Sequence, residues 1–188
     1  MGVPALATAD LSDAAGGAVA MHGRVRPMWS GACLSGRAFT VRTPPGQHPS
    51  VREALELAGP GDVIVIDGAG FTERALWGDK LSLRAQERGV VGLVVDGAVR
   101  DTALIEALGF PVFAVASTPT GPLTELEGEV GSAIECGGLR VEPGDLVVGD
   151  ADGVVVVRAA VAEDVLGRLP DAAPQIVGVS PRKRPRIR

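Results

Sequence analysis

The chain has 188 residues, a formal net charge of −5 and 46% hydrophobic residues, of which few are aromatic. This length supports one domain with a sizeable core, and the acidic balance argues against nucleic acid as a partner. Its two cysteines, Cys33 and Cys136, are too few for a disulfide framework and lack metal-type spacing, so we expect a reducing, cytoplasmic setting. We expect no membrane span, because no apolar run approaches ~18 residues, and no signal peptide.

The hydrophobic pattern and the turn residues predict alternating helices and strands through the middle of the chain. In chain order these are a helix over 6–20, which Gly16-Gly17 ends or weakens, a strand over 36–42, a helix over 51–58, a strand over 63–67, a helix over 80–88, a strand over 90–95, a helix over 102–108 and a short strand after Pro111. We expect Gly97 to begin the turn that follows strand 90–95. Such alternation is typical of right-handed βαβ units with parallel strands.

The segment 136–157 has no helical period and predicts short strands joined by turns. The tripeptide Pro143-Gly144-Asp145 repeats the earlier Pro60-Gly61-Asp62, and each precedes an apolar strand. Asp152-Gly153 before four valines indicates a hairpin. We therefore predict an α/β fold with a central parallel α/β layer and additional antiparallel strands.

Charge is distributed unevenly along the chain, because the last seven residues, RKRPRIR, carry five of the 18 basic residues. Dense like charge and proline oppose folding, so the sequence predicts a disordered basic tail over 181–188. The remaining 1–180 are predicted to form one domain.

Three charged residues, Asp79, Arg100 and Asp101, come directly after the carboxyl ends of two predicted strands. Ligands of open α/β sheets bind at this edge, so we expect the three side chains to converge on one site. Taken singly, each aspartate is explained as an ordinary helix N-cap and the arginine as a surface residue. Their shared position favours a functional site.

The chemistry of these residues suits an anionic substrate and a metal ion. The start of the predicted helix is formed by Gly78, Asp79, Lys80 and Leu81. Its amide groups and dipole favour an anion such as a carboxylate. Arg100 could bind the same carboxylate through two parallel hydrogen bonds from its guanidinium group. Asp101 could hold Mg²⁺, which is often bound through one or two carboxylates and water. A metal and an arginine together stabilise the enolate that forms when a C–C bond next to a 2-oxo acid breaks.

Other candidate sites are weaker. Asp150 to Gly153 begins like a calcium loop, but Val161 stands where that loop needs a glutamate. His22 and His48 have no partners at ligand spacing, and Cys136 is better explained as a small buried residue than as a nucleophile. No GxSxG, P-loop or GxGxxG motif is found in the sequence.

At these residues the sequence resembles the RraA-like family, which includes 4-hydroxy-4-methyl-2-oxoglutarate aldolases and regulators of RNase E. The resemblance runs from ATADLSDA to GDADGVVVV and includes WGDKLSLRAQERGVVGLVVDGAVRD, which holds the Asp-x20-Arg-Asp signature. It implies a swivelling β/β/α fold and a homotrimer or a hexamer of stacked trimers.

The resemblance also implies a role for each site residue. Asp101 would ligate Mg²⁺ or Mn²⁺, and Arg100 would bind the pyruvyl carboxylate and the enolate oxygen. Amides of 78–81 would contact the substrate, and Asp79 would orient a metal-bound water for proton transfer. The regulators typically have glycine at the position of Asp79, so its presence favours an enzyme.

The sequence thus predicts a metal-dependent lyase of the class II type that acts on a small 2-oxo acid. It would be a retro-aldolase that releases pyruvate, an oxaloacetate decarboxylase, or both, because each reaction gives the same pyruvate enolate. The alternative is a non-enzymatic regulator that binds a ribonuclease or another protein. Longer aldolases add an acidic residue to the neighbouring subunit's site from a C-terminal extension, where this chain has only its basic tail, so that contribution and the substrate stay open.

Overall fold

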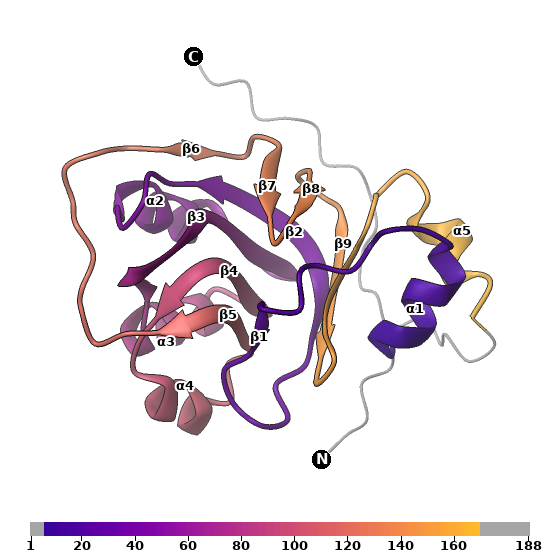
Figure 1. The fold of residues 1–188 in the computed structure, drawn as a ribbon, viewed down its shortest axis with the longest axis horizontal. Coiled ribbons are helices and arrows are strands. Elements are labelled where there is room, and N and C mark those ends of the chain that lie inside the picture. The colour runs from indigo at the N-terminus through magenta and orange to yellow at the C-terminus, as the bar shows by residue number, and fades with distance from the viewer. Residues whose placement is uncertain (1–5, 170–188) are drawn as a thin grey trace.

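The centre of the computed structural model, which describes residues 6–169, is an eight-stranded sheet (Figure 1). Its strands are β1 (Arg26–Pro27), β2 (Leu34–Arg42), β3 (Asp62–Trp77), β4 (Gly92–Val99), β5 (Val112–Ser117), β6 (Glu129–Val130), β9 (Leu146–Asp150) and β10 (Gly153–Val157). The order is β1-β5-β4-β3-β2-β9-β10, with β6 also paired to β2, and β7 (Ile134–Cys136) and β8 (Leu139–Val141) form a separate pair.

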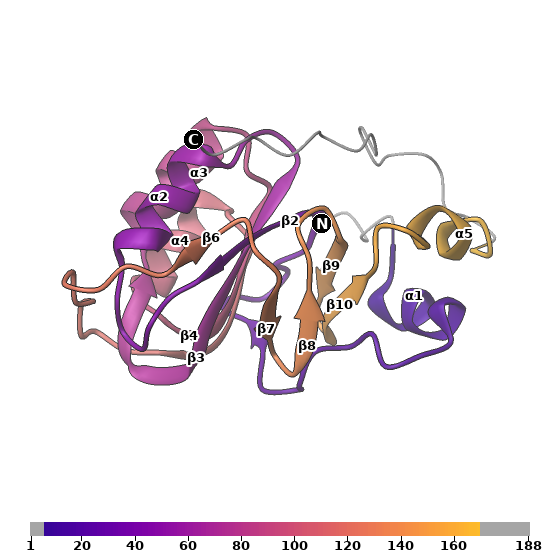
Figure 2. The same cartoon turned by 90° about the horizontal axis from the view of Figure 1, so that it is seen from above.

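Strands β2 to β5 are parallel to one another, and the strands at both ends of the sheet pair antiparallel. This arrangement confirms the predicted fold class. The helices are α1 (Thr8–Ala15), α2 (Pro49–Leu57), α3 (Asp79–Glu87), α4 (Thr102–Leu108) and α5 (Ala162–Leu166). Figure 2 shows α2, α3 and α4 on one side of the sheet and α1 and α5 on the other, beyond β9 and β10.

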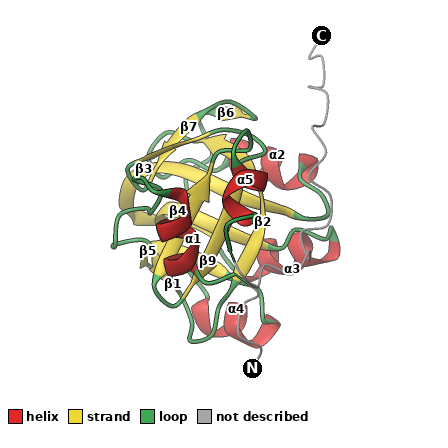
Figure 3. Cartoon of the chain, turned by 90° about the vertical axis from the view of Figure 1, so that its right-hand side faces the viewer, coloured by secondary structure: helices red, strands yellow, loops and turns green. Residues whose placement is uncertain are grey.

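Three apolar clusters hold these layers together. Along β3, Ile64 belongs to the cluster beneath α2, α3 and α4, whereas Val63 belongs to the cluster on the opposite face. Both faces of the central strands are therefore buried, as expected for parallel strands. The third cluster packs Leu11 of α1 and Val165 of α5 against the outer side of β9 and β10, and the two helices lie side by side in Figure 3.

The two Pro-Gly-Asp turns have the same construction. The Asp62 carboxylate accepts a hydrogen bond from the Gly59 amide at 2.9 Å, and the Asp145 carboxylate accepts one from the Glu142 amide at 2.9 Å. In each turn the aspartate carboxylate thus binds the amide three residues earlier in the chain. The strand that follows, β3 or β9, pairs with β2. The predicted hairpin is also confirmed, since Gly153 pairs with Asp150 across β9 and β10.

The first helix ends at Ala15, because Gly16 takes the left-handed conformation with φ 65°, so it stops at the predicted Gly16-Gly17 and does not reach residue 20. Two other predicted boundaries were wrong. Strand 63–67 extends to Trp77 through register shifts against β4. Gly97 begins no turn, because β4 continues to Val99 and Gly97 pairs with Phe71 of the irregular part of β3.

Within the part of the chain that the structure describes, no helix is long and apolar enough to cross a membrane. The predicted tail, 181–188, and the last part of the predicted domain lie outside the described residues.

Candidate active site

A cavity of about 260 Å³ lies at the carboxyl ends of the parallel strands, between α2 and α3. Its lining includes the predicted substrate-binding residues Gly78, Asp79, Lys80, Leu81 and Arg100. The cavity therefore lies at the edge of the sheet where the sequence predicts the site. Asp101 does not line the cavity, but it is adjacent to Arg100, and its carboxylate approaches Gly78.

The start of α3 is fixed by a short chain of buried hydrogen bonds. The Trp77 indole N–H donates to the Ser82 hydroxyl at 2.9 Å, and that hydroxyl donates to the Gly78 carbonyl at 3.0 Å. Gly78 is the N-cap and Asp79 is the first helical residue, so the prediction that Asp79 caps this helix was wrong. The Asp79 side chain is thus available to the cavity, beside first-turn amides that have no partner within the helix.

Asp101 occupies the N-cap position of α4 but does not cap the helix with its side chain. Its backbone is left-handed, with φ 58° and ψ 34°, a conformation that costs a non-glycine residue about 1–3 kcal/mol. The carboxylate instead lies 3.3 Å from the Nε of Arg100 and is 33% exposed. The interpretation of Asp101 as an ordinary cap therefore fails, and strain of this kind is typical of functional positions.

Gly78 lets the Arg100-Asp101 pair approach the helix start closely. A Cβ atom added at Gly78 would lie 2.7 Å from the Oδ2 of Asp101 and 3.2 Å from the Cγ of Arg100. The Arg100 amide also donates to the Trp77 carbonyl at 2.9 Å, which joins the end of β4 to the end of β3. The three predicted segments, 78–81, Arg100 and Asp101, therefore form one cluster.

The cavity carries more positive than negative side chains although the whole chain is acidic. The basic residues of its lining are Arg52, Lys80, Arg84 and Arg100, and the acidic ones are Glu56 and Asp79. A cleft lined mainly by one sign of charge attracts ligands of the opposite sign. The arrangement therefore suits a small anion.

Sequence reasoning missed the wall that α2 contributes, notably His48 and Arg52. The histidine was set aside because no ligand-type partner stands near it in the sequence. Burial, and then the positive charges of Arg52 and Arg100, lower the pKa of His48 below its usual value. The available signal was positional, since α2 follows β2 at the same sheet edge as the predicted site.

Asp101 is the predicted metal ligand, and its carboxylate could hold an ion only together with ligands from outside a protein cluster. Among residues 6–169, no group of three or more His, Cys, Asp or Glu side chains is arranged to bind one. A single carboxylate that makes no cap hydrogen bond fits Mg²⁺ or Mn²⁺, which can keep several waters as ligands. The carboxylate is packed closely against Gly78, where an added Cβ would lie 2.7 Å from its Oδ2, and it is partly exposed.

The dismissed candidates have structural roles. Asp150 accepts hydrogen bonds from the Thr8 amide at 2.8 Å, the Thr8 hydroxyl at 2.7 Å and the Asp152 amide at 2.9 Å, so it anchors α1 and the hairpin. Cys136 is fully buried, and burial raises the pKa of its thiol far above the usual range. Its interpretation as a small buried residue is confirmed.

Comparisons with known proteins agree with this fold. A protein of Halalkalibacterium halodurans, provisionally named 4-hydroxy-4-methyl-2-oxoglutarate aldolase, is 40% identical over 85% of this chain and 76% of its own length. A protein of Thermus thermophilus named 4-hydroxy-4-methyl-2-oxoglutarate aldolase is 35% identical over 80% of this chain and 91% of its own length.

Among solved structures, the RNA-processing inhibitor RraA from Thermus thermophilus superposes with a TM-score of 0.74 and is 35% identical. The match covers 81% of this chain and 92% of that protein. The model of the family described as RraA-like, Aldolase/RraA, matches residues 8–156. The chain belongs to the RraA-like family.

Proposed function

We propose that this protein is a divalent-metal-dependent lyase that cleaves a C–C bond of a 2-oxo acid through a pyruvate enolate. The observation that carries the proposal is the meeting of Arg100 and the start of α3 in one cavity, beside an Asp101 carboxylate that does not cap its helix. The aldolase names of relatives support a lyase in general.

The carboxylate of the 2-oxo acid would bind where Arg100 faces the first turn of α3. Amides of Asp79, Lys80 and Leu81 point out of the helix start, and the helix dipole adds a partial positive charge there. The planar guanidinium group of Arg100 can hold two oxygens at once. Together they would fix the pyruvyl part of the substrate and stabilise the negative charge that grows as the bond breaks.

Asp101 would hold Mg²⁺ or Mn²⁺. When bound, the metal would polarise the 2-oxo group and stabilise the enolate charge as a Lewis acid. The ion pair between Asp101 and Arg100, at 3.3 Å, keeps the carboxylate close to the arginine that contacts the substrate.

Asp79 would act in proton transfer. Its carboxylate belongs to the cavity lining and sits at the first position of α3. In the retro-aldol reaction it would draw the proton from the substrate hydroxyl, directly or through a water molecule, while the C–C bond breaks. Decarboxylation of oxaloacetate needs no such step, so both activities can share this site.

A pyruvate-release assay tests the proposal. Pyruvate formed from 4-hydroxy-4-methyl-2-oxoglutarate or oxaloacetate is followed with lactate dehydrogenase and NADH, with Mg²⁺ and then with excess chelator. Asp101→Asn keeps the size of the side chain and tolerates the left-handed backbone, but it removes the charge. We expect activity to vanish in chelator and to fall at least ~100-fold in Asp101→Asn, with the fold intact by circular dichroism. Full activity in both cases would refute the metal role.

The name of the Thermus thermophilus structure supports a second candidate function, a regulator that binds a ribonuclease. Asp79 favours the enzyme, because a protein-binding regulator needs no acid in the cavity. A ribonuclease pull-down together with the pyruvate assay separates the two functions. Binding without pyruvate release from either acid would support the regulator.

A trimer or a hexamer and a cytoplasmic location also remain predictions. Light scattering tests the assembly, since the chain has a mass of 19.2 kDa and a stable monomer would contradict it.

A further inference from the structure

The wall of the cavity that α2 forms carries a second positive group, separate from Arg100. His48 is the N-cap of α2, and Arg52 follows one turn later on the same side of the helix. Both residues line the cavity. The α2 helix follows β2, whereas Arg100 follows β4, and β3 lies between these strands. Arg52 and Arg100 therefore reach the cavity from elements on either side of β3 in the strand order.

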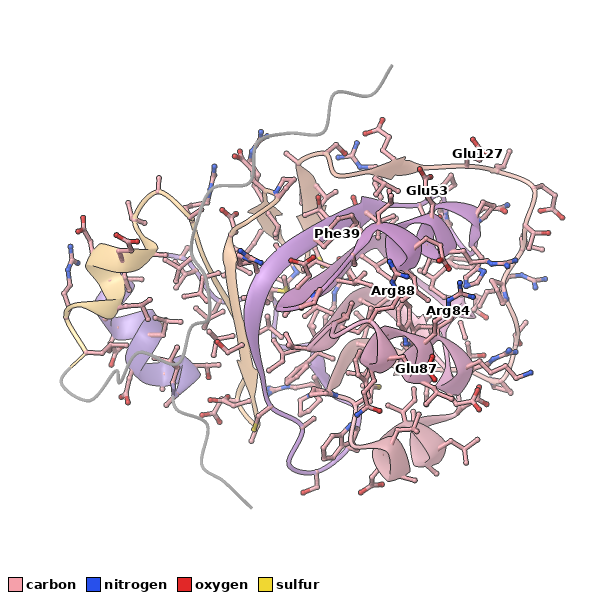
Figure 4. All side chains as sticks on the ribbon, turned by 180° about the vertical axis from the view of Figure 1, so that it is seen from behind. Phe39, Glu53, Arg84, Glu87, Arg88 and Glu127 are labelled. Atoms are coloured by element: carbon pink, nitrogen blue, oxygen red, sulfur yellow. The ribbon has the colours of Figure 1, made fainter. Side chains whose placement is uncertain are left out.

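The guanidinium group of Arg52 has no ion-pair partner among residues 6–169. Its natural partner on the same helix would be Glu56, four residues further along. That carboxylate is instead bound from α3, by Arg84 at 2.6 Å and by Arg88 at 3.8 Å. Figure 4 shows Arg84 and Arg88 on the surface of this helical layer. Arg52 is exposed and lines the cavity without an ion pair among the described residues.

The side chain of His48 complements this charge without adding another. Burial, Arg52 and Arg100 lower the pKa of His48, which favours the neutral imidazole, and in that form one ring nitrogen donates a hydrogen bond. An arginine and a neutral imidazole together can bind a carboxylate. The cavity wall also includes Leu55, Trp77 and Leu81, which can contact a short carbon chain between two charged ends.

We infer that Arg52 and His48 form a second anion subsite, which binds a carboxylate on the part of the substrate beyond the bond that is cleaved. This inference rests on the proposed function, because Arg100 and the start of α3 must hold the carboxylate of the 2-oxo acid. The proposed substrates already carry a second carboxylate, and the inference assigns Arg52 as the residue that selects them over 2-oxo acids with one.

Binding of two matched ligands tests the subsite without turnover. 2-Oxoglutarate and 2-oxopentanoate have the same chain length, but only the first has a second carboxylate. Titration calorimetry with Mg²⁺ present should show that the native protein binds 2-oxoglutarate at least about tenfold more tightly, as expected for one charged hydrogen-bonded contact. Arg52→Gln should reduce this ratio to about one by weakening 2-oxoglutarate alone.

Arg140→Gln is the matched control, because Arg140 is 70% exposed on β8 and lies outside the cavity lining. It should leave both affinities unchanged, and Arg52→Lys should restore part of the preference. An unchanged ratio in Arg52→Gln, or no binding of either acid to the native protein, would overturn the subsite. A preserved preference without pyruvate release from any 2-oxo acid would overturn the proposed reaction and leave the subsite standing.

Discussion

Gly78→Ala provides a sharp test of how closely the site is packed. The added Cβ would stand 2.7 Å from the Oδ2 of Asp101, so the carboxylate must retreat by about 0.7 Å to reach an ordinary contact at 3.4 Å. The atom that must move is the end of a side chain, and φ at Gly78 is −159°, which any residue adopts. The mutation should therefore displace the site and not the fold. A misplacement of ~1 Å can lower a rate ~100-fold, so we expect a decrease in kcat of about 10- to 100-fold.

Stability should change by less than about 1 kcal/mol. Alanine is a poorer N-cap than glycine, by roughly 0.5–1 kcal/mol, but it also restricts the unfolded chain by ~0.4–1 kcal/mol, and the two effects oppose each other. The pyruvate assay gives kcat, and urea titration gives the free energy of unfolding. Gly59→Ala is the control, since no atom lies within 4 Å of its added Cβ. Unchanged activity in Gly78→Ala, or a loss explained by unfolding, would refute this account.

Three further substitutions probe individual side chains. Arg100→Lys keeps the charge but loses the planar fork, so both kcat and apparent affinity should fall in steady-state kinetics; a change in KM alone would limit Arg100 to uniform binding. Asp79→Asn should lower retro-aldol turnover ~10²–10⁴-fold and oxaloacetate decarboxylation much less, and an equal loss of both would contradict proton transfer. Burial, Arg52 and Arg100 lower the pKa of His48 in the folded state. At a pH below about 6.5, the pKa of the unfolded state, the unfolded chain therefore binds more protons than the folded one, so the free energy of unfolding decreases as the pH is lowered. Urea titrations of His48→Gln at pH 7 and pH 5 should therefore show a smaller loss of stability than in the native protein, and identical losses would rule out this contribution.

The sheet edge was predictable because its signals are local. Val63 to Asp67 and Val90 to Val95 are apolar runs bounded by turn residues, which identify buried parallel strands. Once two such strands are neighbours, their carboxyl ends and the residues that follow them must meet. Arg100 and the start of α3 were therefore placed correctly from sequence alone.

The missed features depend on contacts between distant segments. Gly97 looks like a turn residue, yet it stays in β4 because the irregular part of β3 supplies a partner at Phe71. The left-handed backbone of Asp101 has no sequence signal, since aspartate is common at ordinary N-caps. His48 and Arg52 line the cavity because α2 packs beside α3. The order of the elements places α2 at this sheet edge, but neither residue type by itself indicates a site there.

The anchoring of α1 has a consequence for synthesis on the ribosome. Leu11 is fully buried against a cluster that includes Val148 and Val155, and Thr8 is bonded to Asp150. During synthesis α1 therefore cannot pack in its native position until β9 and β10, more than 130 residues later in the chain, have been translated. We expect the nascent chain to pair β2 through β5 while α1 and the edge of β2 that receives β9 stay uncovered. Such an edge is open to pairing with other chains, so slow translation of the last third should favour aggregation more than slow translation of the middle.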